Sequence, residues 1–269
     1  MQNIKHGQGI ISNYIKHDIS STYKEEIIYA LSSGKRIRSL IIGSLRNWDE
    51  VSQHFLLYVE YMHNSGLILY DLMSNVQMRR NLLAVHVKYG TNIAIIVSSN
   101  LMLRANYHLS KAINSMTAAS ASASVSALLL EEISELTLTE DDRSRLLSTM
   151  SAREQKEFII NMIKMKTGRL FSLSLIMGWI GDDKDVNDLK YIKDAGCDLG
   201  ICYHIINDLK DKSRDKSNIC MYFTHNEIID IFTERMLNFS SIVSKHKLWN
   251  NTLKELNMYM IETFKQKIN

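Results

Sequence analysis

Two clusters of cationic side chains have types and spacing that suit the binding of anions. Arg79 and Arg80 are adjacent, and residues 33–38 (SGKRIR) place three cations within four residues just after a glycine. A guanidinium group stays charged at neutral pH, and its planar fork can hold two phosphate oxygens at once. Both clusters therefore predict contacts with a phosphate or diphosphate, although the 33–38 segment taken alone suits a solvated cationic turn equally well.

Helices are the elements that the sequence predicts around these cations. Apolar residues recur from Val59 through Leu72 with Gly66 as the one breaker, and this stretch leads directly into the segment that carries the arginine pair. Apolar residues that recur at helical spacing over this length indicate a helix. An apolar helix that ends in two guanidinium groups suggests an apolar channel with an anion-binding site at its opening.

Helix breakers are scarce throughout the chain, which has no proline and only 11 glycines in 269 residues. We therefore expect long helices joined by short polar turns. The expected elements are one or two helices in residues 1–33, with residues 20–22 as the N-cap of a helix at 23–31, helices at 50–70, at 91–114, within 151–179 and at 185–212, a polar loop at 212–218, and two or three closing helices in 226–269. The small-residue segment 118–130 suits either a linker or a closely packed helix, and we favour the helix.

Composition is that of an ordinary globular protein, with 45% apolar and 23% charged residues. A net charge of +3 without a concentrated basic arm gives no reason to expect a nucleic-acid partner. The three cysteines, Cys197, Cys202 and Cys220, lack metal-ligand spacing and indicate reduced, mostly buried thiols. Neither a signal-peptide core nor an apolar run of about 18 residues is present. We expect a soluble cytoplasmic protein without a membrane span.

Residues 59–90, VEYMHNSGLILYDLMSNVQMRRNLLAVHVKYG, resemble the first aspartate-rich region of the trans-isoprenyl diphosphate synthase (polyprenyl synthetase) family. That family reads approximately E-x-x-H-N-x-S-L-x-x-D-D-x-x-D-x-x-x-x-R-R-G, followed by H-x-x-Y-G. The spacing is most similar to that of eukaryotic-type geranylgeranyl diphosphate synthases. The residues that fall into register are Glu60, His63, Asn64, Leu67, Asp71, Arg79, Arg80, His86, Tyr89 and Gly90.

Further motifs extend the resemblance over about residues 30–225. Residues 34–38 are similar to the family's G-K-R-x-R-P motif, with Ser39 in place of the proline, and residues 166–171 (KTGRLF) are similar to its K-T-G-x-L-F motif. Residues 196–211 resemble the second aspartate-rich motif, G-x-x-x-G-x-x-F-Q-x-x-D-D-x-x-D. Tyr203, His204 and Asn207 replace its Phe, its Gln and its first Asp. The family's G-Q-x-x-D motif has no equivalent in residues 129–142.

The resemblance implies an all-α isoprenoid synthase fold, with about ten or more helices around a central apolar cavity. It also implies a single domain over residues 1–269 and a homodimer. The implied reaction is the head-to-tail prenyl transfer of isoprenoid biosynthesis, in which an allylic diphosphate ionises and the double bond of isopentenyl diphosphate attacks the carbocation. An apolar pocket protects that carbocation from water, and Mg²⁺ neutralises the leaving diphosphate.

The resemblance also assigns expected roles to matching residues of this chain. Isopentenyl diphosphate would be bound by Gly34, Lys35, Arg38, His63 and Arg80. The allylic diphosphate would be bound by Arg79, Lys166, Thr167 and His204. Mg²⁺ would be held by Asp71, Asn207, Asp208 and Asp211, and catalysis would depend on Lys166, Thr167, Asp71 and Asp208. Chain length would be set by the small Ser65 and Gly66, one turn before Tyr70, which resemble the residues of enzymes that make C20 products.

The aspartate motifs depart from the family at the positions that would ligate Mg²⁺ directly. The D-D-x-x-D pattern reads YDLMS here, so Tyr70 and Ser74 replace its outer aspartates, while Asn207 replaces the direct ligand of the second motif. One charge pair at about 4 Å is worth roughly 4 kcal/mol at an effective dielectric of about 20. Half of that energy, lost three times, slows ionisation by on the order of 10⁴-fold. We expect weak or altered catalysis and fewer Mg²⁺ sites.

Three functions are compatible with these substitutions. The retained cations favour a divergent Mg²⁺-dependent prenyltransferase that binds isopentenyl and allylic diphosphates. The first alternative is a catalytically silent subunit that forms a heterodimer with an active prenyl diphosphate synthase, which would explain the missing carboxylates. The second alternative is a terpene synthase derived from the same family, although it needs the same metal-driven ionisation.

Overall fold

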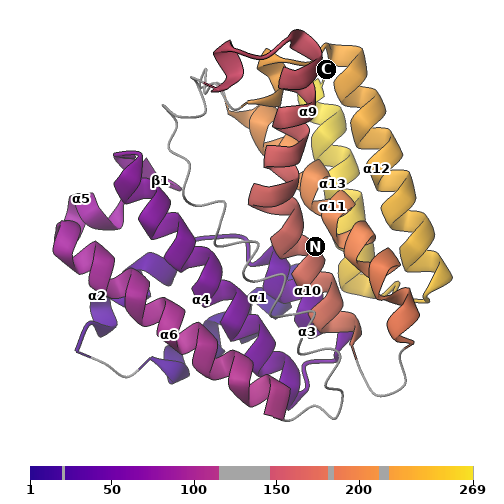
Figure 1. The fold of residues 1–269 in the computed structure, drawn as a ribbon. Helices are drawn as coiled ribbons and strands as arrows, with labels where there is room; N and C mark the ends of the chain where they lie inside the picture. The colour runs from indigo at the N-terminus through magenta and orange to yellow at the C-terminus, as the bar shows by residue number, and fades with distance from the viewer. Residues whose placement is uncertain (20–21, 115–145, 181–184, 212–217, 269) are drawn as a thin grey trace. The chain divides into compact units, whose positions relative to one another are not determined.

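The computed structural model of the chain is almost entirely helical. It describes residues 1–19, 22–114, 146–180, 185–211 and 218–268. These residues contain eleven α-helices and one two-stranded hairpin (Figure 1). The all-α prediction is therefore confirmed. The chain divides into two compact units, Met1–Ser122 and Ala123–Asn269, which we describe separately. The single domain and the central cavity stay predictions.

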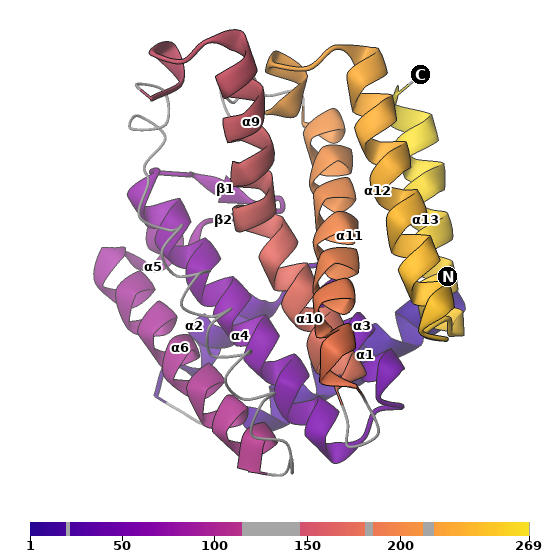
Figure 2. The same ribbon diagram turned by 45° about the vertical axis from the view of Figure 1, so that its right-hand side comes forward.

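The first unit is built around two long helices, α4 and α6, which pack along each other in both ribbon views (Figures 1 and 2). Its helices are α1 (Gln2–Asp18), α2 (Lys24–Leu31), α3 (Ile37–Leu45), α4 (Glu50–Met73), α5 (Val85–Tyr89) and α6 (Thr91–Asn114). Fully buried apolar side chains such as Phe55 and Val59 on α4 and Val97 and Leu101 on α6 form the core between the two helices. Burial of this apolar surface is the main source of their stability.

Helix α4 carries most of the residues singled out in this unit. It starts after Asp49, whose carboxylate accepts a hydrogen bond from the backbone N–H of Ser52 at 2.6 Å. This N-cap satisfies one of the orphan donors at the helix start. The helix expected at 50–70 is confirmed and extends to Met73, and the helix expected at 91–114 is observed with the same bounds.

A short antiparallel hairpin follows α4 and was not expected from the sequence. Strands β1 (Met78–Arg79) and β2 (Leu82–Leu83) pair Met78 with Leu83 and Arg79 with Leu82. The two residues between them, Arg80 and Asn81, have φ values of 52° and 65°. Two successive left-handed residues are typical of a type I′ turn, whose twist matches that of a β-hairpin. The hairpin therefore separates the two neighbouring arginines, one on a strand and one in the turn.

The expected N-cap at residues 20–22 is wrong. Helix α2 starts at Lys24, and the residue at its N-cap position is Tyr23. Residues 20–21 lie outside the described part of the chain, as do the helix favoured at 118–130 and most of the polar loop expected at 212–218.

The second unit is a set of helices packed around α11. Its elements are α9 (Ala152–Ile163), a π-helical turn η2 (Lys164–Gly168), α10 (Arg169–Trp179), the 3₁₀ turns η3 (Val186–Asp188) and η4 (Ile219–Met221), α11 (Leu189–Lys210), α12 (His225–Lys245) and α13 (Asn251–Ile268). The closing segment thus forms two helices, as expected. Helices α9 and α12 begin with capping boxes, Ser151 with Glu154 and Thr224 with Glu227. Such reciprocal bonds fix where a helix begins.

Glycine allows α11 to lie very close to η2 and α10. A Cβ atom added to Gly196 would lie 2.5 Å from the Cα of Ser172, and one added to Gly200 would lie 2.7 Å from the Cα of Gly168. Backbone atoms cannot give way to such a Cβ, so α11 could not approach α10 this closely with any larger residue at these positions.

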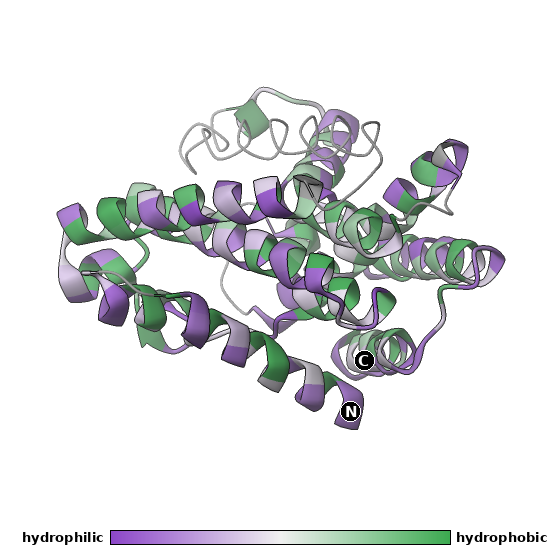
Figure 3. Cartoon of the chain, turned by 90° about the horizontal axis from the view of Figure 1, so that it is seen from below, coloured by the Kyte–Doolittle hydropathy of each residue, from purple (hydrophilic) through white to green (hydrophobic). Residues whose placement is uncertain are grey.

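Most of the described helices carry both hydrophilic and hydrophobic residues, as Figure 3 shows. Helix α10 is the exception among them, because all its residues from Leu170 to Trp179 are buried. None of the described helices combines the length and the apolarity that are required to cross a bilayer. All three cysteines are free thiols; Cys197 and Cys202 are buried and Cys220 is exposed. Burial raises the pKa of Cys197 to about 11, which makes its thiol a weak nucleophile.

Candidate diphosphate-binding site

Three side chains of the first unit converge on a cationic cluster. Nε2 of His63, on α4, lies 3.3 Å from Nη1 of Arg38 in the first turn of α3 and 3.5 Å from Nη2 of Arg80 in the hairpin turn. Guanidinium groups can only donate, so Nε2 must accept, which places the ring proton on Nδ1. Burial, followed by the charges of Arg38 and Arg80, holds the pKa of His63 well below its usual range. A neutral imidazole therefore lies between two cations, and the cluster suits an anion.

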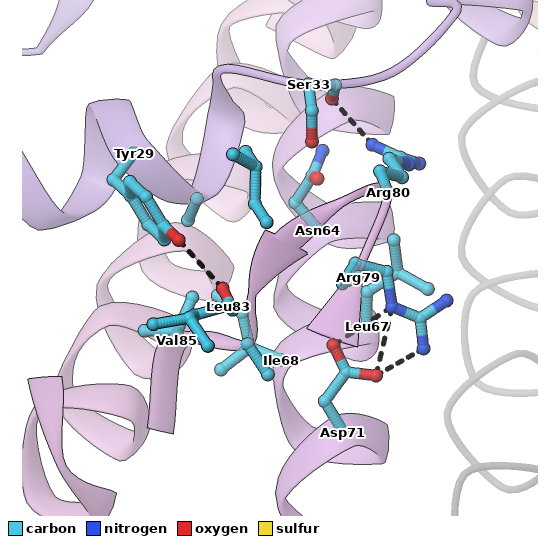
Figure 4. Close-up of a pocket in the computed structure, with 13 residues that line it drawn as sticks. Tyr29, Ser33, Asn64, Leu67, Ile68, Asp71, Arg79, Arg80, Leu83 and Val85 are labelled. Carbon is cyan, nitrogen blue, oxygen red and sulfur yellow. Dashed lines mark hydrogen bonds and ion pairs between the residues drawn. The ribbon is translucent and has the colours of Figure 1, made fainter. Parts of the chain in front are cut away.

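Arg80 is anchored to the glycine turn that precedes α3. Its Nη1 donates to the carbonyl oxygen of Ser33 at 2.6 Å (Figure 4). Gly34 has a φ of +127°, and a Cβ atom there would lie 2.5 Å from the same nitrogen. Glycine is thus needed both for the backbone conformation and for the approach of Arg80. The neighbouring Lys35 is exposed, and its carbonyl oxygen accepts a bond from Nε2 of Gln8.

A small pocket lies beside these arginines and joins α2, the end of α4 and the hairpin. Its cavity volume is about 30 Å³, room for roughly one or two water molecules. Figure 4 shows the apolar side chains of Ile68 and Val85 on one side of the pocket and Arg79 and Arg80 on the other, with Leu67 next to Arg79. The combination suits a short apolar tail with an anionic head, but a diphosphate ester would fit only if the arginines moved.

Asp71 is engaged by Arg79 within this pocket. Nε of Arg79 lies 3.0 Å from both carboxylate oxygens of Asp71, and its Nη2 also bonds Oδ1. The Asp71 side chain is only 5% exposed, whereas that of Arg79 is 33% exposed. A metal ion would have to displace this guanidinium to reach the carboxylate.

The residues expected to set chain length do not all face an open channel. Ser65 is buried, and its hydroxyl lies 3.0 Å from the carbonyl oxygen and 2.9 Å from the hydroxyl of Ser98 on α6. Gly66 and Tyr70 are half-buried. Ser65 therefore forms part of the contact between α4 and α6, and a bulky residue there would push the two helices apart.

The second unit brings together a chain of three polar side chains. Oγ1 of Thr167, in the π-helical turn, lies 2.8 Å from Nδ1 of His204 on α11. Nε2 of His204 lies 3.4 Å from Oδ1 of Asp208, one turn further along α11. The other carboxylate oxygen of Asp208 accepts a 3.0 Å bond from the backbone N–H of Ile219. Asp208 thus ties α11 to the turn η4.

The other predicted residues of this unit lie nearby in the chain. Lys166 is half-buried beside Thr167 in η2, and Asn207 is half-buried beside Asp208 on α11. Asp211 is exposed just past the end of α11. The π-helical turn was not expected from the sequence; such turns widen a helix locally and occur frequently at functional sites.

The carboxylates do not fit the family's full set of metal ligands. Within the described part of the chain, no three His, Cys, Asp or Glu side chains form a group that could hold a metal ion. Asp71 is paired with Arg79, and Asp208 with His204 and a backbone N–H. Mg²⁺ binds through carboxylates together with phosphate oxygens, and these two carboxylates are already engaged by protein groups.

Sequence reasoning missed a buried network beneath the cationic cluster. The side chains of Arg36 and Ser39 each donate a hydrogen bond to the carboxylate of Glu60 there, and all three residues are almost fully buried. Glu60 was noticed only as a residue of a resembling motif, and Arg36 only as one of three neighbouring cations. The sequence does not indicate which cation of this turn is buried, because that depends on the backbone conformation of the turn. Lys35 is exposed, whereas Arg36 is buried.

Comparison with known proteins identifies the family. The family model for polyprenyl synthetases matches residues 20–221, and the chain belongs to this family. Geranylgeranyl diphosphate synthase of Sulfolobus acidocaldarius is 27% identical over 78% of this chain and 64% of its own length. Its counterpart in Saccharolobus solfataricus is 29% identical over 74% of this chain and 60% of its own length. The chain thus spans less than two thirds of these relatives.

Solved structures establish the fold. A geranyltransferase from Legionella pneumophila aligns with a TM-score of 0.80 and 19% identity, covering 96% of this chain and 95% of its own. A geranyltransferase from Helicobacter pylori, complexed with magnesium and isoprenyl diphosphate, aligns with a TM-score of 0.75 and 18% identity, covering 96% of both chains. The chain has the isoprenoid synthase fold.

Proposed function

We propose that this protein is a divergent prenyltransferase of the isoprenyl diphosphate synthase type that binds isopentenyl diphosphate in its first unit. The observation that carries the proposal is the cluster of Arg38, His63 and Arg80. Two guanidinium groups that face one neutral imidazole bind a diphosphate in a fork-like manner, and Gly34 and Lys35 complete the corner. The apolar side chains of Leu67, Ile68 and Val85 line the pocket that Arg80 also borders, where an isopentenyl tail would be shielded from water.

In this proposal, side chains of the second unit bind the allylic diphosphate. Lys166 provides charge, while the hydroxyl of Thr167 and the ring of His204 provide hydrogen-bonding atoms. In the first unit, Arg79 would become available to an anion only when it releases Asp71. We propose a product of up to C20, in keeping with the names of the geranylgeranyl diphosphate synthases among the relatives, and a dimeric assembly, which the sequence resemblance implies. The three free cysteines support a cytoplasmic location, because thiols persist in a reducing compartment.

Catalysis is expected to be slow in this proposal, because the carboxylates that would bring Mg²⁺ to the diphosphates are substituted or engaged. Tyr70, Ser74 and Asn207 replace direct ligands of the family pattern. The remaining candidates, Asp71, Asp208 and Asp211, leave room for fewer Mg²⁺ ions with lower affinity.

A second function is favoured by one specific observation, the bidentate Asp71–Arg79 pair. A carboxylate that is neutralised inside the protein cannot serve a metal ion, which is what a catalytically silent subunit would show. In this alternative the chain would bind diphosphates, form a heterodimer with an active prenyl diphosphate synthase and alter its output.

A product assay distinguishes the two functions. Purified protein would be incubated with isopentenyl diphosphate and allylic diphosphates of C5, C10 and C15, with Mg²⁺ or with a chelator. Prenyltransfer predicts a metal-dependent longer diphosphate, whereas a cyclised hydrocarbon would indicate a terpene synthase instead. No turnover, together with measurable binding of isopentenyl diphosphate, would support the silent subunit; the absence of both would overturn the two proposals.

A further inference from the structure

Arg36 lies in the middle of the glycine turn but points away from the anion cluster. Its side chain is 7% exposed, and its Nη1 lies 2.5 Å from Oε2 of Glu60 on α4. Its Nη2 also donates to the carbonyl oxygen of Leu31 at the end of α2. The backbone of Arg36 has a φ of +56° at the N-cap position of α3. A non-glycine residue with positive φ is uncommon, and here the side-chain bonds hold it in place.

The second oxygen of the Glu60 carboxylate binds the first turn of α3. Oγ of Ser39 donates to Oε1 of Glu60 at 2.6 Å, and the Ser39 side chain is fully buried. Ser39 occupies the position where the resembling motif has a proline, which has no hydroxyl group. This chain therefore has a bond between α3 and α4 that a proline could not make.

Residues of the network lie next to an anion-binding residue on each of the helices α3 and α4. Arg38 lies between Arg36 and Ser39 in the chain, so both of its flanks are tied to one carboxylate. On α4, His63 follows Glu60 by three residues, and residues three apart share a helix face. A shift of Glu60 relative to α3 would therefore change the distance between Nη1 of Arg38 and Nε2 of His63, which is now 3.3 Å.

We propose that Arg36, Glu60 and Ser39 are positioning residues that set the register of the diphosphate-binding cations without contacting the ligand. The inference rests on the diphosphate binding in the proposed function, not on turnover. A buried ion pair is poor evidence for stability, since apolar replacements are frequently as stable. The geometry points to a role in alignment, because one carboxylate fixes both flanks of Arg38.

The test is calorimetric titration of the whole chain with inorganic pyrophosphate in the presence of a chelator, which removes any metal contribution. The double variant Arg36→Met/Glu60→Leu replaces the pair with apolar groups, and Ser39→Ala removes only the hydroxyl group. Arg104→Met is the matched control, because it also deletes a guanidinium of the first unit, one that pairs with Asp18 at 3.3 Å. Every variant is also studied in a Lys166→Met background, which suppresses binding by the second unit.

We expect the double variant to bind pyrophosphate at least about tenfold more weakly, since a displacement of about 1 Å at a site can cost on the order of 10²-fold. Ser39→Ala should show a smaller loss and Arg104→Met a change below about twofold. Wild-type affinity in a folded double variant, or an equal loss in Arg104→Met, would overturn the inference. If the double variant does not fold, unchanged affinity in Ser39→Ala overturns it. Pyrophosphate binding that depends on these residues, without prenyl transfer by the wild type, would refute the proposed activity and leave the inference standing.

Discussion

The two units hold their candidate diphosphate ligands in different ways. In the first unit, Arg38, His63 and Arg80 meet within 3.5 Å, and Arg80 is fastened to a backbone carbonyl oxygen. In the second unit, the chain from Thr167 through His204 to Asp208 ends on a backbone N–H. The first arrangement concentrates positive charge, whereas the second contains one carboxylate that is already engaged.

The difference shows which ligands the described side chains suit in their present arrangement. Anion recognition needs cations at fixed positions, and these are retained together with the glycine that admits one of them. Metal binding needs carboxylates that are available to an ion, and Asp71 and Asp208 instead bond protein groups. A buried carboxylate is costly unless it has such partners, and Asp71 has one in Arg79.

The largest expected effect comes from restoring carboxylates next to Asp71. Tyr70→Asp combined with Ser74→Asp places acids four residues apart, where both can lie on one helix face. At roughly 2 kcal/mol per ligand, Mg²⁺-dependent turnover should rise by on the order of 10³-fold. The measurement is product formation against Mg²⁺ concentration. Tyr70→Asn with Ser74→Asn is the uncharged control, and an equal gain in that control would contradict the electrostatic argument.

The next effect concerns the retained anion site. Gly34→Ala adds a Cβ atom 2.5 Å from Nη1 of Arg80 at a φ of +127°. Displacing Arg80 should weaken the binding of isopentenyl diphosphate by about 10²-fold, and the strained backbone should lower the free energy of unfolding by about 1–3 kcal/mol. Gly9→Ala is the matched control, because a Cβ atom there meets no atom within 4 Å. Calorimetry and chemical denaturation would measure the two quantities, and equal behaviour of both variants would refute the assigned contact.

The Asp71–Arg79 pair can be broken to expose the carboxylate. Arg79→Gln should lower the free energy of unfolding by about 2 kcal/mol, less than for a fully buried pair because Arg79 is one third exposed. It should also make the melting temperature rise with added Mg²⁺, since Asp71 becomes available. The control is Arg153→Gln, which removes the partner of Glu157 in a highly exposed pair. A melting temperature of Arg79→Gln that ignores Mg²⁺ would show that Asp71 cannot bind it.

Much of the fold could be predicted from the sequence, because helix periodicity and the scarcity of breakers are local properties. The helix at 91–114 was expected with its observed bounds. The helix expected at 50–70 is observed at Glu50–Met73, three residues longer at its C-terminal end. The hairpin was not foreseen, since Arg80 and Asn81 adopt left-handed conformations without a glycine to signal the turn. The π-helical turn at Lys164–Gly168 was likewise invisible, because its sequence continues an ordinary helical pattern.

The candidate site was predictable where residue type alone defines the chemistry. Arg38, His63 and Arg80 were named from their motifs, and the structure brings them together. The state of each residue was not predictable, because it depends on a tertiary partner. Neither the pairing of Asp71 with Arg79 nor that of Ser65 with Ser98 has a sequence signal. Arg36 and Arg38 are the same residue type two positions apart, yet Arg36 bonds Glu60 and Arg38 lies beside His63.

The smallest expected effect is a dependence of stability on pH that arises from the anion site itself. Burial and the neighbouring Arg38 and Arg80 hold the pKa of His63 well below 6.5 in the folded chain. The unfolded chain has no such neighbours and takes up a proton on this ring near pH 6.5. Below that pH the unfolded state therefore binds more protons than the folded state, so stability falls as the pH falls.

This histidine should contribute at most about 1.4 kcal/mol per pH unit to the slope of the unfolding free energy against pH, at pH values below about 6.5. His54 contributes in the same direction, because burial and the neighbouring His108 lower its pKa, and its Nδ1 lies 3.0 Å from Nδ1 of His108. Urea denaturation of the wild type, His63→Gln and His54→Gln at several pH values separates the two contributions. His63→Gln should flatten the curve more, since two guanidinium groups face His63, whereas a single histidine faces His54. An unchanged slope in His63→Gln would show that the imidazole is not held neutral between its cations, and the preorganised anion site would lose its physical basis.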